Sequence, residues 1–194
     1  MSHTVDPHTD RILILDFGSQ YTQLIARRIR ELGVYCEIRP YSFEADRIRD
    51  FAPLGIILSG GPNTVTYSST PRPDPVLYEL ELPLLGICYG MQAMAAQLGG
   101  RVEIASMREY GSARVAVQGQ SGLLQDLGEK GNSPFEELDV WMSHGDRVVE
   151  LPPGFQIIAS SDNAPMAAIA DYDRQFFGLQ FHPEVTHTSQ GQRI

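Results

Sequence analysis

The residues best suited to covalent chemistry are Cys88 and its neighbours in the run 86–90 (GICYG). An apolar run precedes the cysteine and a helical pattern follows it, so Cys88 is predicted where a buried strand turns sharply into a helix. This is the geometry of a nucleophile elbow, with cysteine in the place that serine usually takes. The helix N-terminus favours the thiolate over the thiol. We therefore predict that Cys88 is a nucleophile, whereas Cys36, inside a plain strand pattern, is predicted to be a core cysteine.

A base for this nucleophile is found at His182, directly after another apolar run. Pro183 disfavours the helical conformation for the residue before it, so the segment is predicted to be extended. In an extended segment, residues two apart share a side, which brings Glu184 beside His182. Alone, this pattern is more often a solvated strand end. Combined with the elbow, it predicts a triad in which Glu184 orients His182 and His182 activates Cys88.

The predicted acyl transfer also needs donors for an oxygen that becomes negatively charged. The N–H of Tyr89 belongs to the elbow, and the loop 59–62 (SGGP) after a neighbouring predicted strand can supply a second N–H, from Gly61. The same loop could instead bind phosphate. It lacks the G-K-[ST] ending of phosphate loops, however, and Pro62 removes an N–H that phosphate would use. We therefore predict an oxyanion hole formed by Gly61 and Tyr89.

The elements that must position these residues alternate through the first half of the chain. Apolar runs predict strands and helical spacings predict helices, followed in the second half by short strands with few helices. The pattern predicts one α/β domain over residues 11–194, after a flexible tail over residues 1–10, with a three-layer, flavodoxin-like, mostly parallel open sheet and an antiparallel extension. The strands are expected at 11–16, 34–39, 54–58, 82–88, 101–104, 113–117, 140–142, 156–160, 167–169 and 176–180, and the helices at 20–32, 45–51 and 89–98.

Composition excludes several classes of partner. The net charge is −9 and no cluster of Lys or Arg stands against it, so no nucleic-acid partner is expected. There is no signal-like segment and no run of apolar residues long enough to span a membrane, so we expect a cytoplasmic protein with no membrane partner. The five histidines and two cysteines show no ligand spacing, so no metal site is expected.

Three of these motifs, SGGP, GICYGMQ and HPE, occur together in the class I, or triad, glutamine amidotransferases. Nearly the whole chain resembles that family, and in particular the amidotransferase domains of GMP synthases. The narrower resemblance rests on segments 15–21 (LDFGSQY), 60–63 (GGPN), 141–146 (WMSHGD) and 182–188 (HPEVTHT), and on Tyr89 after the nucleophile. It implies the family's fold and the hydrolysis of glutamine to glutamate and ammonia.

The resemblance also implies a set of substrate contacts. Glutamine is expected to contact Gly60 and Gln92, and its α-ammonium group is expected to meet Asp146. The backbone of Ser143 and His144 is expected at the α-carboxylate. From the residues alone, Gln92 could equally be a solvent-facing helix residue, and His144 an ordinary loop histidine.

GMP synthases also carry an ATP-pyrophosphatase domain, the synthetase, which uses ammonia to convert xanthosine monophosphate (XMP) to guanosine monophosphate (GMP). The resemblance implies that this domain is the partner. ATP and Mg²⁺ are expected to bind there, and no cofactor is expected in the present chain. The sequence stops before the last helix expected of an amidotransferase domain, so we expect either a piece of a longer protein or a separate subunit.

Other functions fit parts of the pattern. The chain could serve a different ammonia-using synthetase, or act as a non-catalytic module that senses glutamine or docks a synthetase. The complete triad argues against a non-catalytic module. A cysteine peptidase or γ-glutamyl hydrolase on the same fold is a further alternative, against which only the resemblance of segments 15–21 and 141–146 argues.

Overall fold

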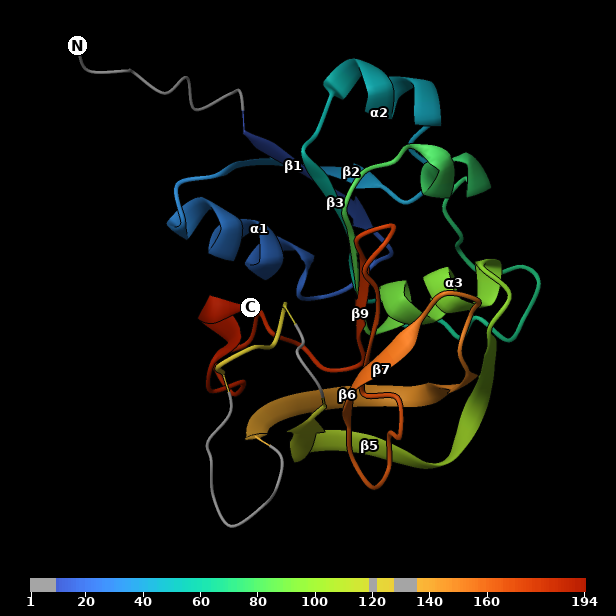
Figure 1. Ribbon diagram of the computed structural model, residues 1–194. Helices are drawn as coiled ribbons and strands as arrows, with labels where there is room; N and C mark the ends of the chain where they lie inside the picture. The colour runs from blue at the N-terminus through green and yellow to red at the C-terminus, as the bar shows by residue number, and fades with distance from the viewer. Residues whose placement is uncertain (1–9, 119–121, 128–135) are drawn as a thin grey trace.

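The computed structural model describes residues 10–118, 122–127 and 136–194. The predicted tail lies outside the described residues except for Asp10, and the first strand begins at Arg11. Within the described residues, one nine-stranded sheet runs through the molecule in the order β2-β1-β3-β4-β9-β8-β7-β5-β6 (Figure 1). No described helix is long and apolar enough to cross a lipid bilayer.

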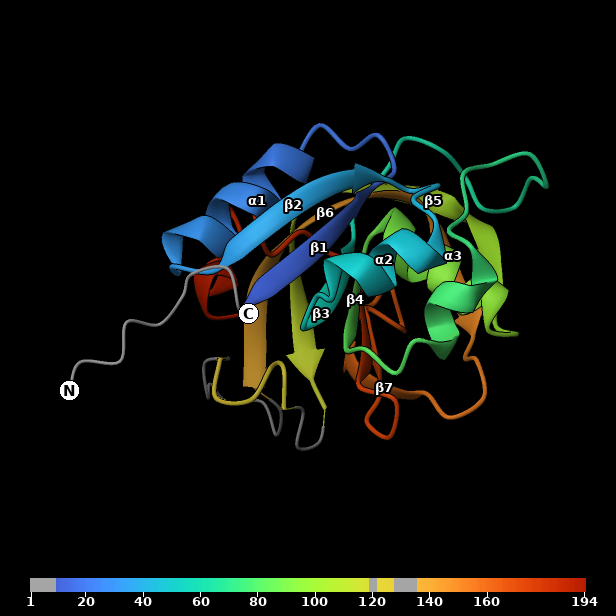
Figure 2. The same ribbon diagram turned by 90° about the horizontal axis from the view of Figure 1, so that it is seen from above.

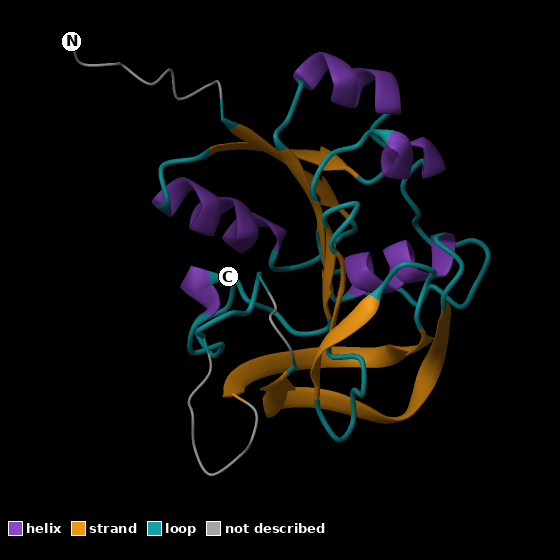
Figure 3. Cartoon of the chain, viewed as in Figure 1, coloured by secondary structure: helices purple, strands orange, loops and turns teal. Residues whose placement is uncertain are grey.

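One half of the sheet is parallel and is covered by helices on both faces, as Figure 3 shows. Ile14 packs with Ile25 and Cys36 on the face covered by α1. Leu13, which points to the other side of the same strand, packs with Ile48 of α2. Burial on both faces explains why the strand that contains Leu13 and Ile14 is an apolar run. The elements are β1 (Arg11–Asp16), α1 (Thr22–Glu31), β2 (Tyr35–Pro40), α2 (Ala45–Phe51), β3 (Gly55–Leu58), the 3₁₀ turn η1 (Pro75–Glu79), β4 (Leu84–Ile87), α3 (Tyr89–Gln97) and β9 (Phe176–Leu179).

The other half is antiparallel and is more extensive than the short predicted strands suggested. Its two longest strands lie side by side and curve across one end of the molecule (Figures 1 and 2). The elements are β5 (Arg101–Val117), β6 (Glu136–Glu150), β7 (Gln156–Ser160) and β8 (Ala168–Asp171), and a 3₁₀ turn, η2 (Gly191–Arg193), lies near the end of the chain.

The prediction of separate strands at 101–104 and 113–117 was wrong, because β5 is continuous. Its register shifts between Ile104 and Glu109, and Gly111 has a φ of 110°, so the alternating pattern is broken although the strand goes on. The strand predicted at 140–142 was likewise too short. In β6 every second side chain is buried, but two of the buried positions are the polar His144 and Asp146, which hid the alternation.

Candidate active site

The cysteine elbow forms where β4 ends at Ile87 and α3 begins at Tyr89. Cys88 lies between the two elements with φ of 51° and ψ of −107°. A positive φ is unfavourable for a residue with a side chain, and such strain concentrates at functional sites. The elbow leaves the sulfur on the wall of a cavity, although Cys88 is only 5% exposed.

The glycines of the elbow allow the backbones around it to touch. A Cβ on Gly86 would lie 2.6 Å from the Met91 nitrogen, and a Cβ on Gly90 would lie 2.3 Å from the Leu58 carbonyl oxygen. No side chain fits at either position, so α3 packs directly on β3 and β4. The position of Cys88 is therefore fixed by backbone contacts.

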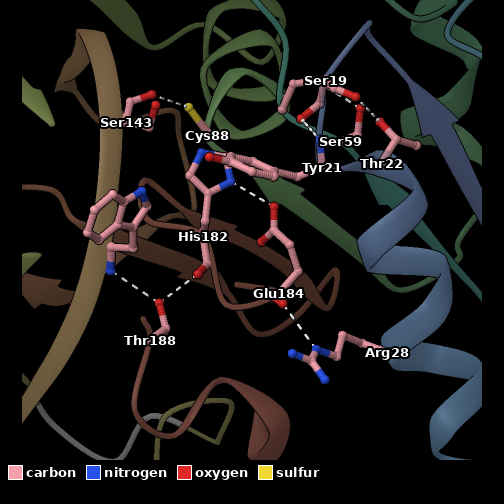
Figure 4. A network of polar contacts seen from close by, with 12 residues as sticks. Ser19, Tyr21, Thr22, Arg28, Ser59, Cys88, Ser143, His182, Glu184 and Thr188 are labelled. Atoms are coloured by element: carbon pink, nitrogen blue, oxygen red, sulfur yellow. Dashed lines mark hydrogen bonds and ion pairs between the residues drawn. The ribbon is translucent and has the colours of Figure 1, made fainter. Parts of the chain in front are cut away.

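His182 and Glu184 form a buried pair beside the sulfur (Figure 4). The His182 Nδ1 atom lies 2.7 Å from Glu184 Oε1. Burial lowers the pKa of His182, but hydrogen bonds with Cys88 and Glu184, together with the negative charge of both groups, outweigh it and raise that pKa to about 10. The imidazole is therefore held as a cation at neutral pH.

The ring of His182 is also fixed by its neighbours. Tyr21 packs edge-on against it, with ring centroids 5.1 Å apart and planes at 68°. Gly60 lies so close that a Cβ there would be 3.2 Å from His182 Cε1. Arg28 of α1 donates a hydrogen bond to the Glu184 carbonyl oxygen, at 3.1 Å. The segment that carries the base is thus bound to the first helix.

Both predicted oxyanion donors belong to residues that line the same cavity as Cys88, namely Gly61 and Tyr89. The buried Ser59 hydroxyl accepts from the Phe17 N–H at 3.0 Å and donates to the Gly60 carbonyl oxygen at 2.8 Å. The C=O and N–H of a trans peptide point in opposite directions. By holding the Gly60 carbonyl, Ser59 therefore also fixes the direction of the Gly61 N–H.

The cavity has a volume of about 650 Å³, within the range of small-molecule sites. Most of the residues predicted for the site line it. Two do not: Gly60 lies against the His182 ring, and Glu184 lies behind that ring. The predicted residues that line the cavity are Gly61, Cys88, Tyr89, Gln92, Ser143, His144, Asp146 and His182.

The alternative in which Gln92 faces solvent is wrong, because its side chain is 3% exposed and lines the cavity. Its Nε2 atom donates to the Asp146 carbonyl oxygen at 2.8 Å and to Gln180 Oε1 at 3.1 Å. Both amide hydrogens are therefore used within the protein, so the amide oxygen is the atom of this group that can accept from a ligand. Gln180 in turn donates to the Cys88 sulfur, at 3.7 Å.

The alternative in which His144 is a loop histidine is also wrong, because the residue is buried within β6. Its ring nitrogens lie 3.1 Å from Glu109 Oε2 and 3.0 Å from the Asp146 carbonyl oxygen. Asp146 has a buried carboxylate oxygen, Oδ2, without a hydrogen-bond partner among the described residues. Buried carboxylates normally have partners, so this oxygen suits a positively charged ligand group in the cavity.

Ser143 meets the nucleophile through its backbone. Its carbonyl oxygen accepts from the Cys88 thiol at 3.5 Å.

Among the described residues, no group of three or more His, Cys, Asp or Glu side chains converges as a metal site. The predicted residues therefore gather around a thiol, an imidazole and a carboxylate, an arrangement suited to acyl transfer. Sequence reasoning gave no site role to Tyr21, Ser59, Glu109 and Gln180.

Comparison with known proteins places the chain in a family. Residues 13–194 match the profile of the glutamine amidotransferase class-I family. The chain is 62% identical over 190 residues to the GMP synthase (glutamine-hydrolyzing) of Nitrosococcus oceani, and 61% identical over 191 residues to that of Methylococcus capsulatus. Each match covers 97% of this chain but 36% of the relative, so the chain spans about a third of the length of these curated relatives.

Solved structures share the fold. A GMP synthase subunit protein from Thermoplasma acidophilum has a TM-score of 0.79 at 28% identity, over 95% of this chain and 89% of that one. A Thermotoga maritima glutamine amidotransferase has a TM-score of 0.70 at 22% identity, over 91% of this chain and 76% of that one. The profile match takes in almost the whole chain and all three predicted triad residues. The chain belongs to the class I glutamine amidotransferases.

Proposed function

We propose that this chain hydrolyses the side-chain amide of glutamine through a thioester on Cys88 and supplies the ammonia to a synthetase that makes GMP from XMP. The observation that carries the hydrolytic part is the meeting of the Cys88 sulfur with a buried His182–Glu184 pair on the wall of one cavity. The family match supports glutamine as the source of the ammonia.

Substrate binding follows from the lining of the cavity. We assign the α-ammonium group of glutamine to the Asp146 carboxylate, whose Oδ2 has no hydrogen-bond partner in the described part of the chain, with the Gln92 amide oxygen as a second acceptor. The backbone of Ser143 and His144 completes the predicted contacts at the α-carboxylate. The side chain of glutamine then extends toward the sulfur, because all four residues line the cavity that Cys88 also lines.

In the first half of the reaction, the Cys88 thiolate attacks the amide carbon and forms a carbon–sulfur bond. The N–H groups of Gly61 and Tyr89 stabilise the oxyanion, a contribution that typically amounts to about 3–4 kcal/mol per donor. His182, held as a cation, gives its proton to the leaving nitrogen. The carbon–nitrogen bond breaks and ammonia departs, leaving a γ-glutamyl thioester.

In the second half, the neutral His182 removes a proton from water and the resulting hydroxide attacks the thioester. The carbon–sulfur bond breaks, and the new γ-carboxyl group gives its proton to solvent as glutamate leaves. Cys88 is again a thiolate and His182 again a cation. Glu184 keeps the imidazole oriented through both halves and does not itself react.

The synthetase part of the proposal rests on the relatives. The Nitrosococcus oceani and Methylococcus capsulatus proteins are GMP synthases, and about two thirds of each lies beyond the region that this chain matches. We place the acceptor of ammonia, together with ATP and Mg²⁺, in a partner equivalent to that remaining portion.

Ammonia release from glutamine is the experiment that tests the proposal. It is measured for the chain alone and after addition of the synthetase portion of the Nitrosococcus oceani enzyme with Mg·ATP and XMP. We expect release that is abolished in Cys88→Ala and that rises with the complete mixture. An electrophilic glutamine analogue should label Cys88 and leave the buried Cys36 unmodified. Release that survives in Cys88→Ala would contradict the hydrolytic role, and no rise with XMP would contradict the synthetase part.

A further inference from the structure

Strand β6 lies at the edge of the sheet, and part of its outer backbone edge is bonded to residues from other parts of the chain. Three alternate residues of the strand direct their carbonyl oxygens to this side. The Asp139 oxygen accepts from the Ser189 N–H at 3.1 Å, and the Trp141 oxygen accepts from the His182 N–H at 3.0 Å. The Ser143 oxygen accepts from the Cys88 thiol. One strand therefore holds both the nucleophile and the base.

The ladder between β6 and His182 contains an inserted hydroxyl group, as Figure 4 shows. The Trp141 N–H donates to Thr188 Oγ1 at 3.1 Å, and that hydroxyl donates to the His182 carbonyl oxygen at 2.6 Å. The Thr188 side chain thus bridges two backbone groups that a regular ladder would join directly. The hydroxyl hydrogen is donated to the His182 carbonyl oxygen, and a lone pair of the hydroxyl oxygen accepts from the Trp141 N–H. Thr188 is 4% exposed, so water is poorly placed to replace it.

The chain folds back after the triad in order to place this hydroxyl. The Thr188 N–H donates to the Val185 carbonyl oxygen at 3.2 Å, which closes a turn after Glu184. The next residue, Ser189, is bound to Asp139 of β6. The turn and this attachment fix Thr188 beside His182 from both sides.

We infer that Thr188 is a positioning residue, whose hydroxyl sets the distance between β6 and the His182 backbone and so places the imidazole against the Cys88 sulfur. The inference rests on the proposed function, in which His182 is the proton carrier. Without the hydroxyl, the Trp141 N–H and the His182 carbonyl oxygen lose their shared partner, and the segment is free to shift. A displacement of about 1 Å at a reacting group can cost on the order of 10²-fold in rate.

Two pairs of variants test the role of the hydroxyl. Thr188→Val keeps the shape and removes the hydroxyl, whereas Thr188→Ser keeps the hydroxyl. Thr188→Ser and Thr188→Ala differ only in the hydroxyl and serve if the valine variant does not fold. Thr186→Val is the matched control, because it makes the same change at an exposed threonine two residues earlier in the chain.

The readouts are the kcat and KM of glutamine hydrolysis and the rate of Cys88 alkylation by iodoacetamide at neutral pH, followed by mass spectrometry. We expect kcat to fall roughly 10- to 100-fold in Thr188→Val and Thr188→Ala with KM nearly unchanged. Thr188→Ser should recover most of the loss, and Thr186→Val should behave as wild type. Alkylation should slow toward the rate of His182→Ala, which a loss of global stability alone would not produce in folded protein.

Two results would overturn the inference. The first is a folded hydroxyl-free variant with the kcat and alkylation rate of the wild type. The second is equal damage in Thr188→Ser and Thr188→Ala, which would assign the effect to the lost methyl group. Activity in Cys88→Ala would instead refute the proposed function, so the two failures are distinguishable.

Discussion

The parallel and antiparallel halves of the sheet hold the site by different means. In the parallel half, the nucleophile is placed by backbone packed on backbone, and the glycines at 86 and 90 leave no room for a side chain. In the antiparallel half and the segment that follows β9, the base and the substrate contacts are placed by hydrogen bonds, many of them from side chains.

This difference determines how each half of the sheet responds to amino-acid substitution. Overpacking forces backbone shifts and cannot be relieved gradually. A lost hydrogen bond removes one constraint and leaves the others in place. Substitutions in the parallel half should therefore cause all-or-none failure, whereas those in the hydrogen-bonded half should cause graded losses of rate.

The largest expected effect is that of Gly90→Ala. The added Cβ would lie 2.3 Å from the Leu58 carbonyl oxygen, so α3 must move away from β3. We expect a loss of about 3 kcal/mol or more in the free energy of unfolding, together with loss of activity. Urea denaturation measures the free energy of unfolding, and ammonia release from glutamine measures the activity. Gly122→Ala, which has open space around the added atom, is the control. A stable, active Gly90→Ala would show that the elbow is not fixed by packing.

The next largest effect is expected for Glu184→Gln, a change in the hydrogen-bonded half. The amide keeps the size of the carboxylate and can still accept from His182 Nδ1, but it no longer stabilises the imidazolium. We expect kcat to fall by roughly 10³- to 10⁴-fold, with measurable turnover remaining. Steady-state kinetics on folded protein provides the measurement. If Glu184→Gln were as inactive as Cys88→Ala, the assignment of an orienting role to Glu184 would be wrong.

Ser59→Ala combines the two cases, because Ser59 supports an element of the parallel half through a side-chain hydrogen bond. The variant frees the Gly60 carbonyl oxygen, so the Gly61 N–H is no longer held in one direction. We expect kcat to fall by at most about 10²-fold, less than the loss of a whole oxyanion donor, with little change in KM. Glutamate γ-semialdehyde, which forms a tetrahedral adduct with a thiol, should bind more weakly to the variant. Unchanged affinity for this aldehyde would mean that Ser59 does not support the hole.

The last prediction concerns the pH dependence of stability and not the rate of hydrolysis. The folded-state pKa of His182 is about 10, above its ordinary value of 6.5. The protonated His182 therefore stabilises the folded state fully below about pH 6.5, and this stabilisation is lost as the pH rises through about 10. The free energy of unfolding of the wild type should fall more steeply between these limits than that of His182→Gln. Parallel curves would show that the ion pairing of His182 contributes nothing to folding.

The sequence was sufficient to predict that Cys88, His182 and Glu184 would lie together, and to predict much of the parallel half. Cys88, His182 and Glu184 lie in short motifs whose geometry is local, and β1, β3 and β4 are apolar runs because both of their faces are covered. These signals need no knowledge of distant residues.

The other supporting residues could not be predicted in the same way, because their partners are far away in the sequence. Ser59 bonds to Phe17, and Gln180 bonds to Gln92 and Cys88, about ninety residues away. Thr188 reaches Trp141 across 47 residues. Tertiary hydrogen bonds of this kind produce no periodic pattern in the sequence. The extent of β6 was missed for a related reason, since the polar His144 and Asp146 occupy buried positions that would otherwise be apolar. The extent of β5 was missed because its register shifts between Ile104 and Glu109.

The docking of the catalytic segment on β6 has a consequence for solubility. An edge strand with unpaired backbone groups is a template for pairing with another chain. In this protein the residues from His182 to Ser189 occupy part of that edge at Asp139 and Trp141. We therefore expect the segment to which we assign proton transfer also to protect the molecule from edge-to-edge association. Variants that loosen it should aggregate more readily as they lose activity, and the two defects should grow together.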